Sequence, residues 1–377
     1  MGIKEVEMKS PKILLIKPPL DGHDRPIHDL IVFLRKRNID SIWPGLQQSW
    51  TQIIKTAIEE DPDAIGVSVH TGDPVVLLGH LKKLLESSGL ENKILIAGGS
   101  GEITFPDVRE KLSAMGFKVF LSATTHDEIA KYILRECREK EKNQQNEFAV
   151  GHGIPREILA AAITSQERGS LILSTPVESN AITVVLGGPT GAGKSSLLNA
   201  VLERVGKRGI KIAVFLCDPR GPKLKGAFLG DRLVVQDHTS NENIFIRSVS
   251  QFGNYSKKRV TFLKNLAGLA KLWGAKLIFF ETIGLGQETS SAIKNLADLF
   301  LWVALPNETD DLRLMKGGAH ELADAILLNK IDKEPAFRAE LALKERFQKP
   351  YFPVSAITGE GIDALCEFLD EKLSKIK

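Results

Sequence analysis

Residues 188–195, which read GPTGAGKS, have the spacing of a phosphate-binding loop. An apolar segment typical of a strand precedes them and a segment typical of a helix follows, which is the context that such a loop requires. Its glycines let backbone N–H groups approach phosphates, its lysine supplies a positive charge, and its first serine can bind Mg²⁺. The predicted phosphate contacts are Gly188, Thr190, Gly191, Ala192, Gly193, Lys194, Ser195 and Ser196.

A second segment, NKID at residues 329–332, follows the apolar run DAILL. A carboxylate at Asp332 can accept hydrogen bonds from N1–H and N2–H₂ of guanine, which adenine lacks, so the segment predicts GTP and GDP as ligands rather than ATP. The segment SAITG at residues 355–359 adds backbone that could meet guanine O6. The predicted base contacts are Asn329, Lys330, Asp332, Ser355, Ala356 and Ile357.

Two further acidic residues follow apolar runs. Glu281 in FFETIG can hold Mg²⁺ through water, and the N–H of Gly284 can reach a γ-phosphate. Asp218 in LCDPRGP is another candidate on the Mg²⁺ side, although a helix or turn cap is an alternative role for it. The predicted magnesium site therefore consists of Ser195, Asp218 and Glu281.

From about residue 153 to its end, the chain contains, in order, GPTGAGKS, DPRGP, LGDR, FIRS, ETIGLGQ, MKGGAHELAD and NKID. This order resembles that of the GTPase chaperones that serve methylmalonyl-CoA mutase. The resemblance implies a GTP-hydrolysing switch that controls loading of a cobalamin cofactor. It places Asp218 in the first switch segment and Glu281 to Gln287 in the second, so the implied catalytic residues are Lys194, Asp218, Glu281 and Gln287. Arg220 and Gly221 depart from the family's DPSSP, and the chain ends about one helix after SAITG, where the family continues into a dimerisation arm.

Near the start of the chain, DGHDRP at residues 21–26 follows another apolar run. Asp21 can hold one ring nitrogen of His23 and leave the other for a metal, and Lys17 could pair with Asp21. A zinc site would need three or four ligands, and no other His or Cys cluster lies nearby in the sequence. A single histidine suits a metal whose other positions are filled by a macrocycle, although a lone histidine is more commonly an ordinary surface or core residue.

The segments KPPLDGHD, GLQQS, EEDPDAIGVSVH and IAGGSGEI resemble the cobalamin-binding domain of acyl-CoA mutases. In that family the benzimidazole tail leaves cobalt and enters the sheet, and a histidine replaces it. The resemblance implies adenosylcobalamin as cofactor and His23 as the cobalt ligand, with Asp21 and Lys17 behind it. The other implied cofactor contacts are Gly22, Asp24, Arg25, Ser68, His70, Gly98 and Gly99. Pro26 and His70 depart from the family, which often has Gly and Leu there.

The order of these two parts resembles the first half of fused isobutyryl-CoA mutases without the mutase barrel. The resemblance implies a subunit or chaperone of a coenzyme B12-dependent acyl-CoA mutase that needs a separately encoded barrel subunit. An adenosyltransferase and a second copy of this chain are further candidate partners. The alternatives are a cobalamin carrier that performs no rearrangement and a methyl-transferring corrinoid protein. The last is disfavoured because only 22 residues precede His23, which leaves no room for a helical cap.

Strand-like and helix-like segments alternate through the whole chain, which predicts an α/β protein with two doubly wound domains. We expect a flavodoxin-like cobalamin-binding domain at 1–140, a polar linker at 141–152 and a P-loop GTPase domain at 153–377. The candidate ligand groups follow strands, so those of one sheet should share one edge of it.

The composition excludes several classes of protein. The net charge of +3 gives no ground for binding nucleic acid or a membrane, and the longest apolar runs are strand-sized. The N-terminus has no apolar signal core, and the three cysteines form no CxxC pair. These features predict a cytoplasmic protein.

Overall fold

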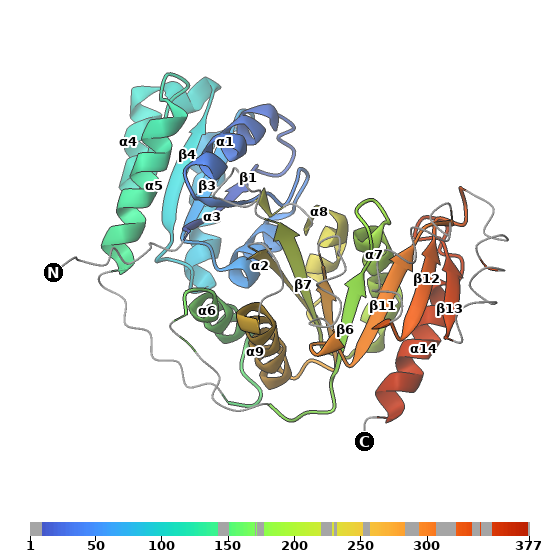
Figure 1. The fold of residues 1–377 in the computed structure, drawn as a ribbon. Coiled ribbons are helices and arrows are strands. Elements are labelled where there is room, and N and C mark those ends of the chain that lie inside the picture. The colour runs from blue at the N-terminus through green and yellow to red at the C-terminus, as the bar shows by residue number, and fades with distance from the viewer. Residues whose placement is uncertain are drawn as a thin grey trace. The chain divides into compact units, whose positions relative to one another are not determined.

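The computed structural model describes residues 10–141, 151–169, 171, 177–219, 228–229, 232–251, 257–282, 294–306, 322–333, 340 and 349–375. The chain divides into two compact units (Figure 1). Unit 1 consists of Met1–Phe148 and Pro219–Leu233, and unit 2 consists of Ala149–Asp218 and Val234–Lys377.

Unit 1 is built on a six-stranded sheet in the order β5-β4-β3-β1-β2-β8, with parallel pairing throughout. Its strands are β1 (Lys12–Ile16), β2 (Asp40–Ile42), β3 (Ala64–Val69), β4 (Ile94–Gly99), β5 (Phe117–Phe120) and β8 (Phe228–Leu229). Its helices are α1 (Arg25–Lys36), α2 (Trp50–Glu60), α3 (Pro74–Ser87), the 3-10 helix η1 (Gly101–Thr104), α4 (Pro106–Ala114) and α5 (His126–Glu141).

Helices cover both faces of this sheet (Figure 1). Ile13 and Leu15 of β1 pack with α1 and α5, whereas Leu14 and Ile16 pack with α2, α3 and α4 on the other face. A strand that is buried on both faces has to be apolar at every position, which explains the continuous run ILLI. The predicted α/β class with parallel sheets is therefore confirmed here.

The last strand of this sheet comes from a distant part of the sequence. In β8, Phe228 lies opposite Ser41 and Leu229 lies opposite Ile42 of β2. The chain thus leaves unit 2 after Asp218, adds a strand to unit 1, and re-enters unit 2 within α8 (Arg232–Val235). The boundaries predicted from the sequence place this whole segment in the second domain.

Unit 2 is built on a seven-stranded sheet in the order β13-β12-β11-β6-β10-β7-β9, and its described pairings from β13 to β7 are parallel. Its strands are β6 (Ile182–Gly187), β7 (Ile212–Pro219), β9 (Ile244–Gln251), β10 (Leu277–Glu281), β11 (Leu299–Ala304), β12 (Ala325–Asn329) and β13 (Tyr351–Val354). Its helices are α6 (Arg156–Glu167), α7 (Lys194–Val205), α9 (Lys257–Trp273) and α14 (Ile362–Lys375), with the 3-10 helices η2 (Gly206–Arg208) and η3 (Gln236–Ser240).

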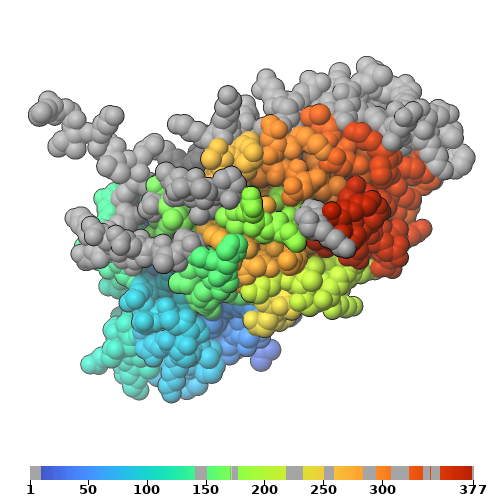
Figure 2. All heavy atoms as spheres, turned by 90° about the horizontal axis from the view of Figure 1, so that it is seen from below, coloured from blue at the N-terminus to red at the C-terminus, as the bar shows by residue number. Residues whose placement is uncertain are grey.

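The second sheet is also covered on both faces. Helices α6 and α9 pack on one face around Phe215 and Phe280, and α7 and α14 pack on the other around Val184 and Leu186. Figure 2 shows α14, in red, on the outer surface of unit 2. The phosphate-binding loop follows the central strand β6, at a carboxyl-terminal edge where open α/β sheets bind their ligands.

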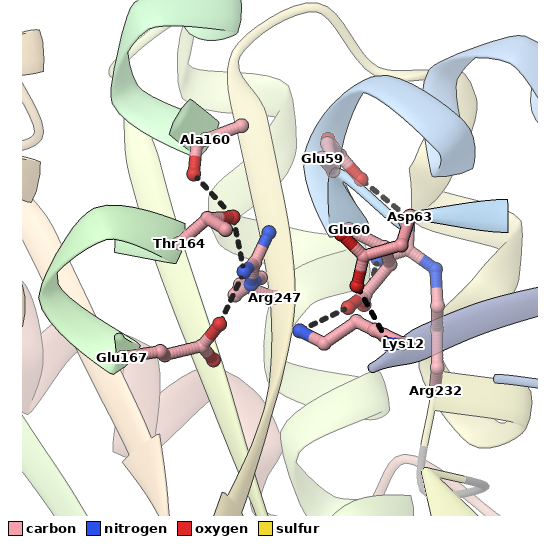
Figure 3. Close-up of polar contacts among 9 residues, drawn as sticks. All are labelled: Lys12, Glu59, Glu60, Asp63, Ala160, Thr164, Glu167, Arg232 and Arg247. Atoms are coloured by element: carbon pink, nitrogen blue, oxygen red, sulfur yellow. Dashed lines mark hydrogen bonds and ion pairs between the residues drawn. The ribbon is translucent and has the colours of Figure 1, made fainter. Parts of the chain in front are cut away.

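A buried arginine joins α6 to the sheet of unit 2. The fully buried Arg247 of β9 pairs with Glu167 at 2.6 Å and donates to Oγ1 of Thr164 at 2.9 Å (Figure 3).

Among the described residues, no helix combines the length and the apolar character needed to cross a membrane.

Candidate functional site

Two of the glycines in the phosphate-binding loop of unit 2 show why this loop needs glycine. Gly188 has φ +148°, and a Cβ there would lie 2.4 Å from the carbonyl oxygen of Val303. Gly193 has φ +84° and immediately precedes α7, so the N-terminus of this helix opens onto the loop. A helix N-terminus with exposed N–H groups is a ready site for phosphate.

Charged and polar side chains gather behind this loop. Nζ of Lys194 lies 3.1 Å from the carbonyl oxygens of both Gly188 and Pro189. Oγ of Ser195 donates to Oε1 of the buried Glu281 at 2.5 Å. The hydroxyl and carboxylate predicted to bind Mg²⁺ are thus in contact, and oxygen ligands of this kind suit that ion.

The third predicted magnesium residue, Asp218, lies in β7, and its side chain is outside the described part of the structure. Glu281 lies opposite Leu216 of β7, so Asp218 follows on the strand beside it. Gly284 and Gln287 lie outside the described residues, as do the two positions of the DPRGP segment that depart from the family, Arg220 and Gly221.

The two segments predicted to bind guanine meet each other and the phosphate-binding loop. Nδ2 of Asn329 donates to the carbonyl oxygen of Ala192 at 2.8 Å, and its Oδ1 accepts from the N–H of Ala356 at 3.3 Å. Oγ of Ser355 donates to Oδ1 of Asp332 at 2.6 Å.

The remaining predicted residues of this site lie around the same loop. Lys330, at φ +68°, places Nζ 2.6 Å from the carbonyl oxygen of Gly191. Thr190, Ser196 and Ile357 are exposed.

In unit 1, a chain of polar side chains follows β1 and holds His23. Nζ of Lys17 lies 3.2 Å from Oδ2 of Asp21, and Oδ1 of Asp21 lies 3.1 Å from Nδ1 of His23. Oδ2 of Asp21 also accepts from the N–H of His70 at 2.7 Å, which ties the end of β1 to the end of β3. Lys17 and Asp21 are buried, whereas the His23 ring is 65% exposed. The ring is therefore oriented from behind and presented outward.

The environment of Asp21 keeps it ionised. Burial would raise its pKa, but hydrogen bonds from the backbone of His70 and His23, from the His23 ring and from Lys17 outweigh burial and lower the pKa to about 2. Burial also lowers the pKa of Lys17, although its pairing with Asp21 opposes that shift. A carboxylate in this position can orient the imidazole and raise its basicity toward a metal.

A cavity of about 300 Å³ opens at the carboxyl-terminal edge of the same sheet. Its lining includes Leu15 from β1 and residues at or just after the ends of β3, β4 and β5, among them Ser68, His70, Gly98, Gly99, Ser100, Ser122 and Thr124. Nδ1 of His70 lies 2.7 Å from Oγ of Ser100, and the His70 ring centroid lies 5.4 Å from that of His23.

Two glycines shape this cavity. A Cβ on Gly99, at φ +148°, would lie 1.7 Å from the carbonyl oxygen of Val69, so only glycine fits. A Cβ on Gly66 would lie 2.8 Å from Cδ2 of Leu15. Gly66 was not among the predicted site residues, although a glycine inside the apolar strand AIGVSV signals a close approach.

The structure brings together only part of the predicted cofactor set. Oδ2 of Asp24 lies 3.3 Å from Nε2 of His28, Arg25 begins α1, and Gly22 has open space where a Cβ would be. Pro26 lies in the first turn of α1, where a proline is well tolerated, and it lines the cavity.

Comparisons with known proteins give the family of this chain. A family model described as Methylmalonyl Co-A mutase-associated GTPase MeaB matches residues 164–377. A protein of Pyrococcus horikoshii that is named as a GTPase is 35% identical over 211 residues, which cover 52% of this chain and 65% of that protein. The fused isobutyryl-CoA mutase of Cupriavidus metallidurans is 28% identical over 335 residues, which cover 84% of this chain and 30% of that protein.

This chain therefore spans just under two thirds of the first relative and less than a third of the second. A solved structure of LAO/AO transport system kinase matches 58% of this chain and 74% of its own, with 21% identity and a TM-score of 0.41, a similarity that carries no argument by itself. The family match covers more than half of the chain and contains the phosphate-binding loop, Glu281 and the NKID segment. This protein belongs to the family of methylmalonyl-CoA mutase-associated GTPases.

Proposed function

We propose that this GTPase binds adenosylcobalamin on unit 1 and serves an acyl-CoA mutase whose barrel is a separately encoded subunit. The observation that carries the proposal is the series Lys17–Asp21–His23, which presents one imidazole beside a cavity at the edge of a parallel sheet.

The surroundings of His23 suit a metal that brings most of its own ligands. With Nδ1 turned toward Asp21, Nε2 is the ring nitrogen that can meet a metal. In the described part of the chain, no three His, Cys, Asp or Glu side chains lie close enough together to hold a metal ion. A metal that is already held in a macrocycle would need only one protein ligand, and His23 could supply that nitrogen.

The cavity suits the tail of such a cofactor. Without β8, the strand order is β2-β1-β3-β4-β5, which is that of flavodoxin-like sheets and puts the switch point between β1 and β3. The cavity has apolar walls with a few hydroxyl groups, as expected for an organic ligand. Nε2 of His70 is buried and has no hydrogen-bond partner among the described residues, so a polar group of a ligand could bind it.

The similarity to fused isobutyryl-CoA mutase supports the same proposal. That alignment covers 84% of this chain, whereas the GTPase family model begins at residue 164. The alignment must therefore extend well into unit 1. The name of that relative, a mutase, links a protein with both parts to acyl-CoA rearrangement.

In the GTPase unit, each group has a defined task. Lys194 neutralises the outer phosphates, and Ser195 with Glu281 holds Mg²⁺, with Asp218 on the neighbouring strand. Asp332 selects guanine. In unit 1, Asp21 orients His23, which would hold the cobalt of the cofactor. When bound, adenosylcobalamin supplies the radical chemistry of the rearrangement. Radical chemistry must be shielded from water, and the His23 side chain is exposed, so a partner subunit would have to cover this site.

The cobalamin assignment is tested by His23→Ala, with His28→Ala as the matched control. His28 lies five residues further on and is half-exposed, and its ring contacts Asp24 rather than Asp21. The His23 variant should lose the visible and EPR spectrum of histidine-bound cobalt and weaken cofactor binding, whereas the His28 variant should keep both. Unchanged EPR hyperfine structure in His23→Ala would overturn the assignment.

Partner dependence is tested by turnover. Purified chain and adenosylcobalamin are mixed with isobutyryl-, methylmalonyl- or hydroxyacyl-CoA, with and without a candidate barrel subunit. We expect isomerisation only when the barrel is present. Turnover by this chain alone would contradict the proposal, whereas cofactor transfer to the barrel without any need for this chain during turnover would favour a carrier.

A further inference from the structure

Two adjacent carboxylates, Glu59 and Glu60, end helix α2, and both side chains are fully buried. The last turn of α2 contains no basic residue. Burial removes the charges from water, and the negative end of the helix dipole repels them. Two ionised groups in this position require compensating positive charge nearby.

Arg232 supplies that charge. One guanidinium nitrogen lies 3.0 Å from Oε1 of Glu60, and the other contacts Oε2 of Glu59 (Figure 3). The arginine side chain is as completely buried as its two partners. Nζ of Lys12 lies 3.9 Å from Oε2 of Glu60 and adds a second, more distant cation. Loss of the arginine alone would remove a buried counter-ion from both carboxylates, which is a large penalty for buried charges.

Arg232 is far from Glu59 and Glu60 in the sequence and lies in a segment that is flanked on both sides by unit 2. It lies 172 residues after Glu60, within Pro219–Leu233, whose neighbours on both sides belong to unit 2. The same segment contributes β8, which pairs with β2 of unit 1. It begins directly after Asp218, the predicted magnesium residue at the end of β7. One covalent segment is thus continuous with the nucleotide site and fastened to unit 1 by a buried ionic contact and a strand pairing.

We propose that Arg232 is a positioning residue that fastens the Pro219–Leu233 segment to unit 1, and that the nucleotide bound in unit 2 acts on unit 1 through this segment. The inference rests on the proposed function for the role of Asp218 at the nucleotide site. A displacement of Asp218 between the GTP and GDP states is transmitted along the chain that follows it. Because Arg232 and β8 contact unit 1, we expect this displacement to change β2 and the end of α2. Both belong to the sheet and helix layer that contains the proposed cofactor site.

Hydrogen–deuterium exchange on the full chain tests this without any cofactor. The wild-type protein is compared with GDP and with a non-hydrolysable GTP analogue, and exchange is followed in peptides that contain β2 and residues 228–233. We expect exchange rates there to differ between the two states by about fivefold or more, since coupling between sites is typically worth 5- to 150-fold. Equal exchange in both states of the wild-type protein would overturn the inference.

Arg232→Met should abolish that difference and make these peptides exchange rapidly in both states. Arg247→Met is the matched control, because Arg247 is also a fully buried arginine with a carboxylate partner but lies outside the segment. The control should keep the difference between nucleotide states. If Arg232→Met does not fold, the double variant Glu59→Gln/Arg232→Met removes one charge of each sign and leaves Glu60 beside Lys12. A nucleotide-dependent difference that survives in either Arg232 variant would contradict the role of Arg232.

The link to the cofactor is then measured by binding. In the wild type, adenosylcobalamin should change the affinity for the GTP analogue relative to GDP by at least about fivefold, and Arg232→Met should bring this ratio to near one. Without adenosylcobalamin, the affinity of Arg232→Met for GDP and for the GTP analogue should differ little from that of the wild type. If the wild type does not bind adenosylcobalamin, the proposed function fails, and the exchange experiment still decides the inference.

Discussion

The nucleotide site of unit 2 and the histidine site of unit 1 lie at the same kind of sheet edge but are built in different ways. In unit 2, a glycine-rich backbone loop is met by Glu281 and Asn329 at the ends of other strands, and Asp332 lies just after the second of these strands. In unit 1, one exposed imidazole is supported by Asp21 and Lys17 next to a mostly apolar cavity. A polyphosphate needs many converging donors, whereas a macrocyclic metal cofactor needs one oriented donor and room for its organic part.

The comparison predicts the largest effect for the charge in the phosphate-binding loop. Lys194→Ala removes the buried cation beside the phosphates, and GTP hydrolysis should fall on the order of 10²–10³-fold, the range for losing one preorganised charge-stabilising group. Phosphate release measures the rate. The exposed Lys207 of η2, which follows α7, is the matched control, and Lys207→Ala should hydrolyse GTP normally. Equal rates in the two variants would contradict the assignment of the loop.

A smaller effect is expected at the guanine contact. Asp332→Ala removes the acceptor for two hydrogen bonds, and GTP affinity should fall by about 150-fold, the low end for two hydrogen bonds to a charged group at about 1.5 kcal/mol each. Affinity for ATP should change much less. Calorimetry with GTP and with ATP measures the two affinities. Equal affinity of the wild-type protein for GTP and ATP would contradict the assignment of Asp332 to guanine.

In unit 1 the supporting residue should matter less than the ligand itself. Asp21→Ala keeps His23 but frees its ring, so adenosylcobalamin affinity should fall about 10- to 100-fold, as for other residues that orient a metal ligand. Absorbance titration with the cofactor gives the affinity. A loss as large as that in His23→Ala would show that Asp21 does more than orient the ring, and no loss would show that the orientation is not needed.

The smallest effect concerns pH. The pKa of Asp21 is about 2 in the folded chain against 3.8 ordinarily, so its ionised form stabilises the fold by about 2 kcal/mol above pH 4. Because the folded pKa is the lower one, this contribution is lost as the pH falls from about 4 to 2. Denaturant unfolding of wild type and Asp21→Asn at pH 6.5, 4 and 3 should show a difference in the free energy of unfolding that shrinks at low pH. A difference that stays constant over this range would exclude the titration of Asp21 as its source.

Much of the fold and of both sites could be predicted because the relevant residues follow local rules. The loop at 188–195 needs only its own glycines, lysine and serine between a strand and a helix. Parallel strands bring their carboxyl-terminal ends to one edge, so Asp21, Ser68 and Gly98 could be placed together from their positions after apolar runs. The cavity residues after β5 were not predicted, although Ser122 and Thr124 follow a strand in the same way.

The sequence by itself determined the nucleotide-binding motif, the acid–histidine pair and the alternation of strands and helices, because each depends on residues close together in the chain. Only the tertiary structure decided where Arg232 lies. Its motif LGDR was visible, but nothing local shows that a segment after β7 adds a strand to unit 1 or that its arginine meets Glu59 and Glu60. Burial of these two carboxylates and the presence of their counter-ion depend on each other across 172 residues, and such pairing is settled only when the whole chain folds.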